Sequence, residues 1–332
     1  MKYVYVLVSS EDDLYYEQAL MSVWSLRFQM PRADIIVLCD DATEKGLCGK
    51  RGALTELATE IRAVPFGADT GKAERSRLIK TAVPDYVDGD FLYIDCDTVI
   101  CGDLSSIEEY EYEAAGVLDG HVMLDEHIHK DYFLARDKAL GFTGTKAAGF
   151  NINGGVILFR STDYARSLFR AWNEAWKYSA YQKHDLHDQS ALNEANVRTG
   201  LKMQLLPGEW NCQPSHGGLA FLKDAKIIHY YSSEFAGKYY IPYYKLADKT
   251  LQMRIKEAGG IPDDIQAMLR EPKFQFNKVH LVGDCRIQSM LQSPLAFSLF
   301  DLKVRMPRLF GALEKAAGSV RNFAKRIKHK HC

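Results

Sequence analysis

The sequence has no apolar run long enough to span a bilayer and no closely spaced pair of cysteines. Its seven cysteines form no Cys-x-x-Cys pair and lie at positions 39, 48, 96, 101, 212, 285 and 332. Neither a zinc site nor a disulfide framework is therefore indicated. Scattered reduced thiols fit a cytosol. Because no signal peptide precedes the apolar run that begins at Lys2, we expect a cytoplasmic protein.

The chain also has little net charge, no internal repeat and no low-complexity segment. Of its 332 residues, 26% are charged and the formal net charge is −1, so the surface as a whole gives no reason to expect nucleic-acid binding. The 47% of hydrophobic residues is typical of a globular protein. The length exceeds what one small core needs. We expect one large domain over residues 1–265 and a C-terminal extension over residues 266–332.

Segments with strand and helix patterns alternate through the first half of the chain. Dense β-branched and aromatic runs predict strands, and apolar residues at helical spacing predict helices between them. The expected strands are 3–8, 34–40 and 91–94, and the expected helices are 15–28, 56–61 and 77–83. This order, with continuous apolar strands, predicts an α/β fold whose mainly parallel central sheet is flanked by helices. Farther along we expect strands at 150–159 and 226–231, and helices at 163–178 and 189–197, with Trp172 and Trp176 in the core.

Polar residues follow three of the predicted strands. They are Ser9 and Ser10, Asp40 and Asp41, and the pair Asp95 and Asp97. Ligands of parallel sheets bind at the carboxyl ends of the strands. We therefore expect one nucleotide-sized crevice at this edge of the sheet.

Asp95 and Asp97 directly follow the strand Phe91–Ile94. Residues i and i+2 of a strand project to the same side, so the two carboxylates can converge on one point. Two anions held that close repel each other unless a proton or a cation lies between them. A hard divalent ion such as Mg²⁺ or Mn²⁺ suits oxygen ligands and can hold a diphosphate. The alternative is that Asp97 begins an exposed turn.

Five stretches occur in an order that resembles the GT-A glycosyltransferases, and most closely family 8 with its lipopolysaccharide galactosyl- and glucosyltransferases and glycogenin-like members. The stretches are residues 3–10, residues 77–103 with the sequence RLIKTAVPDYVDGDFLYIDCDTVICGD, FNINGGVILF at 150–159, DQSALN at 188–193, and IIHY at 227–230 after PGEWN at 207–211. The resemblance implies a Rossmann-like GT-A domain with a mainly parallel sheet. A basic helical tail is expected to follow it, from the residues described below.

The resemblance implies a metal site built from three side chains. Asp95 and Asp97 match the family's Asp-x-Asp pair, which binds Mn²⁺ that bridges the nucleotide diphosphate, and His229 matches the third ligand. An imidazole beside carboxylates suits Mn²⁺ better than Mg²⁺, which stays an alternative. A hydrogen-bonded histidine at a strand end is the other interpretation of His229. The family lysine that follows this histidine and contacts diphosphate is not at its usual spacing, and Lys238 is the substitute we expect.

Further residues match the donor-binding positions of the family. Arg77 and Lys80 resemble the basic residues that face the donor phosphates, where positive charge stabilises the leaving diphosphate, with a solvated basic helix face as the alternative. The residues expected to lie against uracil and ribose are Ser9, Ser10, Asp13 and Tyr16. Tyr16 also fits a core position at a helix start.

Asp119, Asn153, Asp188 and Gln189 form the sugar-facing set that the resemblance implies. Amides and carboxylates can each hold hydroxyl groups through two atoms. In retaining members, glutamine at the position of Gln189 faces the anomeric carbon, and the neighbouring aspartate grips sugar hydroxyls. Asp188 also fits the N-cap of the following helix. The resemblance implies retention with front-side departure of UDP, and no well-placed carboxylate base for an inverting attack is identifiable in the sequence.

The last 30 residues are strongly basic. Nine lysines and arginines stand against Glu314 alone in residues 303–332, and apolar residues interleave with them: Leu309, Phe310, Leu313, Val320, Phe323 and Ile327. A basic amphipathic segment of this kind suits an anionic membrane surface, peripheral to the inner face of the membrane. A disordered solubilising tail and an RNA-binding tail are the alternatives.

These features together predict a Mn²⁺-dependent retaining glycosyltransferase. It would move a hexose from UDP-glucose or UDP-galactose to a glycan or lipid-linked glycan acceptor, such as a lipopolysaccharide or capsule precursor. One alternative is a metal-dependent nucleotide-sugar phosphohydrolase or pyrophosphorylase, against which stands the lack of a glycine-rich loop after the first strand. Another is an inactive glycan- or membrane-binding protein on the same scaffold.

Overall fold

The structure, a computed structural model, describes residues 1–67, 69–231, 243–277 and 293–328, with side chains in the last range described to residue 318. The chain divides into two compact units. The first comprises residues 1–232 and 244–276, and the second comprises residues 233–243 and 277–332. The expected position of Lys238 lies outside the described residues.

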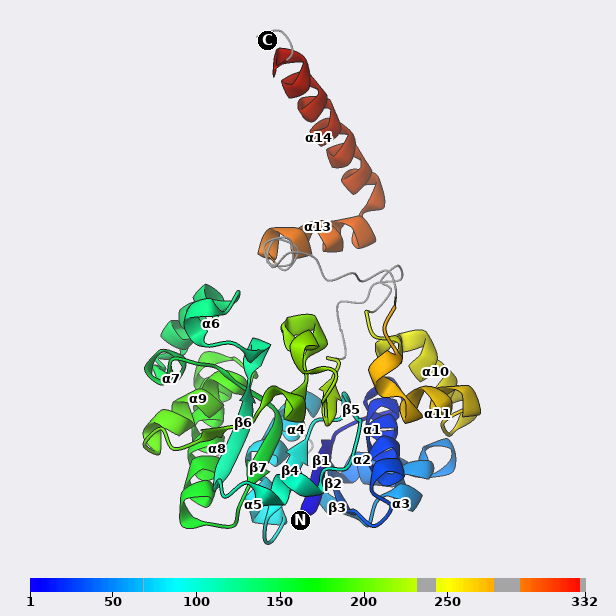
Figure 1. Cartoon of the computed structure of the whole chain (residues 1–332), viewed down its shortest axis with the longest axis vertical. Coiled ribbons are helices and arrows are strands. Elements are labelled where there is room, and N and C mark those ends of the chain that lie inside the picture. The colour runs from blue at the N-terminus through cyan, green and yellow to red at the C-terminus, as the bar shows by residue number, and fades with distance from the viewer. Residues whose placement is uncertain (68, 232–242, 278–292, 329–332) are drawn as a thin grey trace. The chain divides into compact units, whose positions relative to one another are not determined.

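The alternating apolar segments form one seven-stranded sheet in the first unit, in the order β3-β2-β1-β4-β7-β6-β8 (Figure 1). The strands are β1 (Lys2–Leu7), β2 (Asp34–Asp40), β3 (Glu60–Val64), β4 (Phe91–Ile94), β6 (Ala114–Leu118), β7 (Ile152–Phe159) and β8 (Gln204–Leu205). β1 pairs in parallel with both β2 and β4, and β2 with β3. β7 runs antiparallel to β4 and β6, whereas β8 is parallel to β6. The predicted mainly parallel α/β sheet is confirmed.

Because β1, β2 and β4 are parallel, their carboxyl ends lie at the same edge of the sheet. A separate two-stranded sheet of β5 (Thr98–Ile100) and β9 (Ile227–His229) follows this edge. Its antiparallel register pairs Thr98 with His229. The small sheet therefore carries a late segment of the chain back to the end of β4.

Helices cover both faces of the large sheet. On one face Val4, Val6 and Val8 pack in a buried cluster with Ile79 of α4 (Lys72–Thr81) and Trp172 of α8 (Asp163–Lys183). Alternate residues of β1 face the other side, where the Ser22 hydroxyl of α1 (Tyr15–Gln29) donates to the hydroxyl of Tyr5 at 3.2 Å. Trp172 and Trp176 are fully buried, which confirms the prediction that they belong to the core.

The other helices of the first unit are α2 (Asp41–Gly46), α3 (Ala53–Leu57), α5 (Val83–Tyr86), α6 (Lys130–Leu140), α7 (Gly144–Ala148), α9 (Gln189–Arg198), α10 (Lys249–Ala258) and α11 (Asp263–Arg270). Short 3₁₀ turns lie at 49–51, 105–109, 119–121, 124–126, 208–211, 214–216, 218–221, 245–247 and 272–274. The prediction of a helix at 56–61 is wrong, because α3 ends at Leu57 and β3 begins at Glu60. Ile61 and Val64 extend the edge of the sheet beside β2 instead.

The described part of the second unit consists of two helices, α13 (Pro294–Arg305) and α14 (Pro307–Lys328). Ser293 begins α13 as its N-cap, since its hydroxyl accepts a hydrogen bond from the Ala296 amide at 3.2 Å. Among the described residues, no helix is both long and apolar enough to cross a bilayer.

Candidate active site

Two carboxylates and an imidazole converge at the carboxyl edge of the sheet. Asp95 follows the last residue of β4, Asp97 precedes β5, and His229 ends β9. One ligand atom from each of the three lies within 4.8 Å of the others, and His229 Nε2 is 3.2 Å from Asp97 Oδ1. Two oxygen ligands and one nitrogen ligand form a donor set that fits Mn²⁺, and also Mg²⁺ with its stronger preference for oxygen. The structure thus brings together the three predicted metal ligands.

His229 is 3% exposed and is held against the acidic pair. Burial alone would lower the pKa of its imidazole, but Asp97 and then Asp95 outweigh burial and raise that pKa. Asp97 and Asp95 thus favour the protonated form of the ring, whose charge offsets theirs. The carboxylates of Asp95 and Asp97 concentrate negative charge at this point, which favours the binding of a divalent ion.

Gly155 of β7 explains how the ring of His229 reaches this position. A Cβ on Gly155 would lie 2.4 Å from Cε1 and 2.6 Å from Nδ1 of His229. Atoms cannot approach so closely, so the ring fits only because β7 has no side chain here. The Asn-Gly-Gly stretch thus makes room for the ring of His229.

Lys80 of α4 lies between the acidic pair and a second carboxylate. Its Nζ is 3.1 Å from Asp95 Oδ1 and 3.1 Å from Asp188 Oδ2, and the residue is 4% exposed. Burial alone would lower the pKa of Lys80, but Asp188 and Asp95 raise it above its usual value. Lys80 is therefore a buried cation, and the alternative of a solvated basic helix face does not hold for it.

Asp188 precedes α9 and pairs with two cations. Besides Lys80, it contacts Arg77, whose Nε lies 3.3 Å from Asp188 Oδ1. Burial opposes ionisation of this carboxyl, yet Arg77 and Lys80 hold its pKa well below the usual range. The residue occupies the N-cap position of α9, but its side chain makes no capping hydrogen bond. The prediction that the Asp188 side chain caps α9 is wrong, because its carboxylate forms ion pairs with Arg77 and Lys80 instead. Gln189 is half-buried as the first residue of the helix.

Asp119, after β6, lies among amide and imidazole groups. Asn153 Nδ2 donates to Asp119 Oδ1 at 3.0 Å, and His127 Nε2 is 3.5 Å from Asp119 Oδ2. Burial opposes ionisation here too, but the hydrogen bonds from His127 and Asn153 lower the pKa of Asp119 to about 2. His127 is buried. The loop-like, charged flanks of His127 indicate a surface or an acceptor-side residue, and its burial excludes the exposed surface position.

The residues after β1 line a hollow of about 190 Å³ at the ends of β1 and β2, with walls that include Ser9, Ser10, Asp40, Arg51, Lys72 and Arg75. Asp13 stabilises the loop after β1. Its carboxylate accepts hydrogen bonds from the Ser9 hydroxyl at 2.6 Å and from the Ser10 amide at 2.9 Å. Burial alone would raise the pKa of Asp13, but these hydrogen bonds and the charge of Lys72 keep it below its usual value.

Tyr16 lies beneath this hollow and not in its wall. It is 2% exposed, with the Arg51 guanidinium 4.9 Å from the centre of its ring. This placement fits the core position that was the alternative interpretation of Tyr16. Arg51 also donates to the Ser9 hydroxyl at 2.8 Å, a contact that no sequence pattern indicated.

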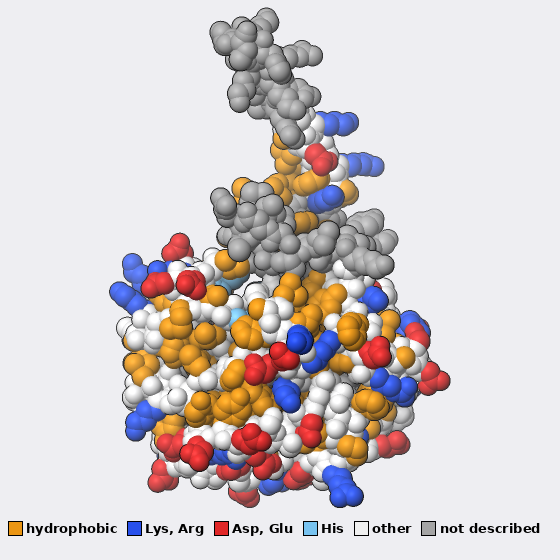
Figure 2. All heavy atoms as spheres, in the orientation of Figure 1, with side chains coloured by type: hydrophobic (Ala, Val, Ile, Leu, Met, Phe, Trp, Pro, Cys, Tyr) orange, Lys and Arg blue, Asp and Glu red, His pale blue; other side chains and the backbone are white. Residues whose placement is uncertain are grey.

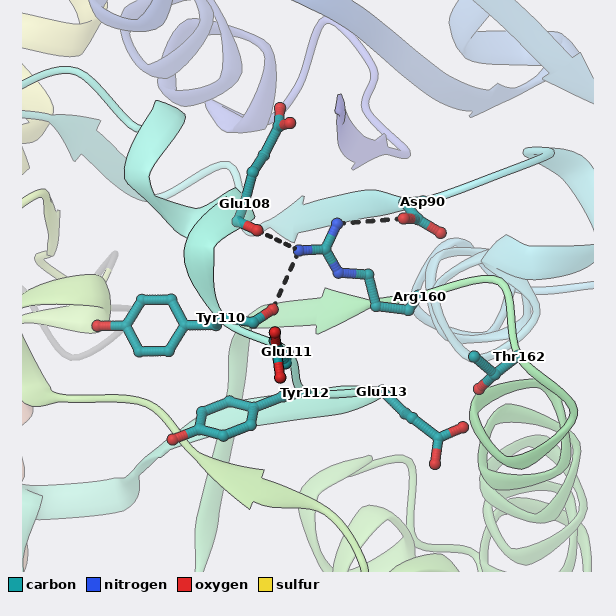
Figure 3. Close-up of a pocket in the computed structure, with 8 residues that line it drawn as sticks. All are labelled: Asp90, Glu108, Tyr110, Glu111, Tyr112, Glu113, Arg160 and Thr162. Carbon is teal, nitrogen blue, oxygen red and sulfur yellow. Dashed lines mark hydrogen bonds and ion pairs between the residues drawn. The ribbon is translucent and has the colours of Figure 1, made fainter.

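A larger hollow, of about 370 Å³, lies at the opposite edge of the sheet, beside the amino end of β4. Figure 3 shows its residues, including Asp90, Glu108, Tyr110 and Arg160. The Arg160 guanidinium pairs with Asp90 at 3.1 Å and donates to the carbonyl of Tyr110 at 3.1 Å. The side chains of Glu108 and Tyr110 point in different directions (Figure 3). The Arg160 guanidinium is thus occupied by Asp90 and by the carbonyls of Glu108 and Tyr110 (Figure 3).

Comparisons with known proteins agree with this geometry. Residues 76–234, which include Asp95, Asp97, Asp188 and His229, match the family model "Glycosyl transferase family 8". Over this stretch the chain matches family 8 of the glycosyltransferases. No curated protein gave a significant match to the sequence.

Two solved structures place this domain among known folds. WbbM, described as a bifunctional glycosyltransferase, has a TM-score of 0.52 at 16% identity over 78% of this chain and 51% of its own. An active-site mutant of LgtC has a TM-score of 0.50 at 14% identity over 80% of this chain and 99% of its own. At these identities the likeness shows the fold alone, and the chain spans about half the length of WbbM. The predicted GT-A-like fold of this family 8 domain is confirmed.

Proposed function

We propose that this family 8 glycosyltransferase is a Mn²⁺-dependent, retaining hexosyltransferase that uses UDP-glucose or UDP-galactose. The observation that carries the proposal is the convergence of Asp95, Asp97 and His229 within 4.8 Å of one another at the carboxyl edge of the sheet. This is the edge at which α/β sheets bind nucleotides. We assign the activity to the domain expected over residues 1–265.

The three ligands would hold the cation beside the donor diphosphate. When bound, Mn²⁺, or Mg²⁺ in its place, supplies positive charge to the oxygens of the diphosphate. Lys80 and Arg77 add fixed positive charge on the neighbouring helix α4, where it stabilises the diphosphate as it leaves. Both cations already pair with Asp188, so they are held in place before the donor binds.

The sugar would lie between Asp188, Gln189 and Asp119. The low pKa values of Asp188 and Asp119 keep both carboxylates ionised at neutral pH, so each can accept hydrogen bonds from sugar hydroxyls. Asn153 contributes by holding Asp119 in place. Gln189, as the neighbour of Asp188, would face the anomeric carbon, with UDP leaving from the face at which the acceptor attacks.

The uridine would occupy the hollow at the ends of β1 and β2. Ser9 and Ser10 line that hollow, and Asp13 holds both in place. Lys238 stays a candidate for a further contact with the diphosphate. Tyr16 would act from below, through its contact with Arg51.

The acceptor we propose is a lipid-linked glycan, such as a lipopolysaccharide or capsule precursor, at the inner face of a membrane. The C-terminal extension, residues 266–332, supports this placement. Residues 303–332 have a formal charge of +8, which leaves the other 302 residues at −9. In α13, in α14 and at the residue between them, the exposed apolar side chains include Phe300, Met306, Leu309 and Leu313. Apolar and basic side chains are both visible on the described part of this segment (Figure 2). Apolar and basic side chains together suit an anionic lipid surface.

The test is UDP release from a panel of UDP-sugars, with Mn²⁺ and with EDTA. We expect slow Mn²⁺-dependent hydrolysis or transfer of one sugar, and at least a ~100-fold loss for Asp97→Asn, because the ion-holding carboxylate contributes several kcal/mol to charge stabilisation. Asp263→Asn is the matched control, since Asp263 is exposed at the start of α11 and at least 34 positions from each of the three ligands. UDP release that does not depend on Mn²⁺ contradicts the proposal. Absence of UDP release from every sugar also contradicts it, and favours an inactive binding protein.

A further inference from the structure

Asn211 lies at the centre of the polar network, although no sequence pattern indicated a role for it beyond its place in the Pro207–Asn211 stretch. It ends a 3₁₀ turn, Gly208–Asn211, and is 0% exposed. Its Oδ1 lies 3.1 Å from His229 Nδ1, and its Nδ2 donates to Asn153 Oδ1 at 2.9 Å. One buried amide thus contacts both a metal ligand and a residue of the sugar-facing set.

The direction of these hydrogen bonds follows from groups whose roles are fixed. The amide of Gly155 can only donate, and it donates to Asn153 Oδ1 at 2.9 Å. The Asp119 carboxylate can only accept at its low pKa, and it accepts from Asn153 Nδ2 at 3.0 Å. The orientation of the Asn153 amide is therefore set from both ends.

Asn211 must then donate to Asn153, because Asn153 Oδ1 is an acceptor. Its own Oδ1 is left to face His229, and an oxygen acceptor requires a proton on Nδ1 of the ring. Nε2 is the nitrogen that faces Asp97, at 3.2 Å. Histidines that bind metals commonly donate their second ring N–H in this way, and the bond fixes both the tautomer and the ring plane.

The polar network also includes His127, which lies beside Asp119. His127 Nδ1 accepts from the backbone amide of His129 at 3.0 Å, so in the neutral ring the proton is on Nε2, which points to Asp119 at 3.5 Å. A row of hydrogen bonds thus runs from His229 through Asn211 and Asn153 to Asp119.

We propose that Asn211 is a positioning residue that fixes Nε2 of His229 as the metal-ligating atom. Through its hydrogen bond to Asn153, it also holds Asp119 at a fixed position relative to the metal site. This inference rests on the proposed function, because it assumes that the three-ligand cluster binds Mn²⁺. It assigns a role to a residue that contacts neither the ion nor the sugar.

Binding of Mn²⁺, followed by the electron paramagnetic resonance signal of the free ion, tests the proposal without any turnover. Asn211→Leu removes the acceptor for His229, and we expect Mn²⁺ affinity to fall about 10- to 100-fold, the usual effect of losing such a partner. Asn211→Asp keeps an acceptor oxygen for the ring but loses the donor to Asn153. We therefore expect it to keep Mn²⁺ affinity within about 3-fold, while the KM for the UDP-sugar rises.

Asn196→Leu is the matched control. Asn196 is also buried, in α9, where its Oδ1 accepts from the Met203 amide at 3.0 Å. The same substitution there is expected to lower stability and leave Mn²⁺ affinity unchanged.

Equal Mn²⁺ affinity in wild type and Asn211→Leu overturns the role of Asn211 and leaves the proposed function standing. An equal loss in Asn211→Leu and Asn211→Asp also overturns it, because the acceptor oxygen would then not be what matters. Absence of Mn²⁺ binding by the wild type overturns the metal site itself, and with it both proposals. If Asn211→Leu does not fold, retained affinity in Asn211→Asp supports the role, and lost affinity contradicts it.

Discussion

The ring of His229 occupies the space that a side chain on Gly155 would fill. A Cβ built on Gly155 would lie 2.4 Å from Cε1 of that ring, whereas the nearest atom to a Cβ on the adjacent Gly154 is Lys80 Nζ, at 3.6 Å. Two neighbouring glycines of one strand therefore differ sharply in what they tolerate. The difference gives a matched pair of substitutions.

Gly155→Ala is expected to displace His229 and to lower Mn²⁺ affinity at least ~10-fold, since the ligand atom would move out of the three-ligand cluster. Gly154→Ala adds the same methyl group at ordinary contact distance and is expected to leave Mn²⁺ affinity within about 2-fold. Titration of both variants with Mn²⁺ makes the comparison. Equal affinities would contradict the assignment of His229 as a ligand.

Lys80 gives a prediction about stability. Its removal in Lys80→Met leaves Asp95 and Asp188 without the buried cation between them, which is expected to lower the free energy of unfolding by about 3 kcal/mol in EDTA. Lys138→Met, at an exposed position of α6, is the control, with an expected change within about 0.5 kcal/mol. Urea unfolding measures both.

A double-mutant cycle separates the ion pair from other effects of Lys80. If Lys80 and Asp188 interact as their 3.1 Å separation indicates, Asp188→Asn added to Lys80→Met should cost at least ~1 kcal/mol less than the sum of the single variants. Additive effects would show that the two residues stabilise the fold independently.

His216 predicts how stability depends on pH. Burial is the main cause that lowers the pKa of His216, to about 4, although Asp119 opposes it. The unfolded chain binds the proton at a pKa of about 6.5, so below that pH the unfolded state gains protons that the folded state does not, and stability falls on acidification.

Between pH 7.5 and 5.0 this histidine should account for a loss of up to about 2 kcal/mol, which His216→Gln should remove. Urea unfolding at the two pH values, in EDTA to keep metal from the neighbouring site, checks the result. An unchanged pH dependence in His216→Gln would mean that His216 titrates normally in the folded protein.

The C-terminal extension predicts binding to anionic vesicles. Reversal of three charges, Lys303→Glu, Arg305→Glu and Arg308→Glu, is expected to lower partition onto phosphatidylglycerol vesicles at least ~10-fold, since each basic side chain near such a surface contributes about 1 kcal/mol. Sedimentation with vesicles measures it, and phosphatidylcholine vesicles show the background. The same reversals at the exposed Lys138, Lys146 and Lys177 are the control. Equal losses in both triple variants would contradict a specific role for the extension.

Much of the scaffold follows from local sequence. Continuous apolar strands followed by polar residues predict where β1, β2 and β4 end, and the helical stripe with Trp172 and Trp176 predicts the buried face of α8. Two of the three proposed metal ligands were also predictable, since Asp95 and Asp97 share one strand end. His229 came only from the resemblance, because nothing local to Ile227–His229 shows that β9 pairs with β5.

The features that could not be predicted from the sequence depend on contacts between segments that are distant along the chain. Burial of His127, the pairing of Asp188 with Lys80 instead of its own helix, and the hydrogen bond from His229 to Asn211 each join residues that are 8 to 108 positions apart. The end of α3 at Leu57 was missed for a similar reason, because pairing of β3 with β2 overrides the helical pattern of residues 56–61.

The central claim is that a divalent ion on Asp95, Asp97 and His229 holds the diphosphate of a UDP-sugar. Calorimetric titration of UDP into the wild type and Asp97→Asn, each with Mn²⁺ and with EDTA, tests it most directly. We predict that UDP binds the wild type at least ~10-fold more tightly with Mn²⁺ than with EDTA, and that Asp97→Asn removes this difference. Equal affinity of the wild type for UDP under both conditions would contradict the claim.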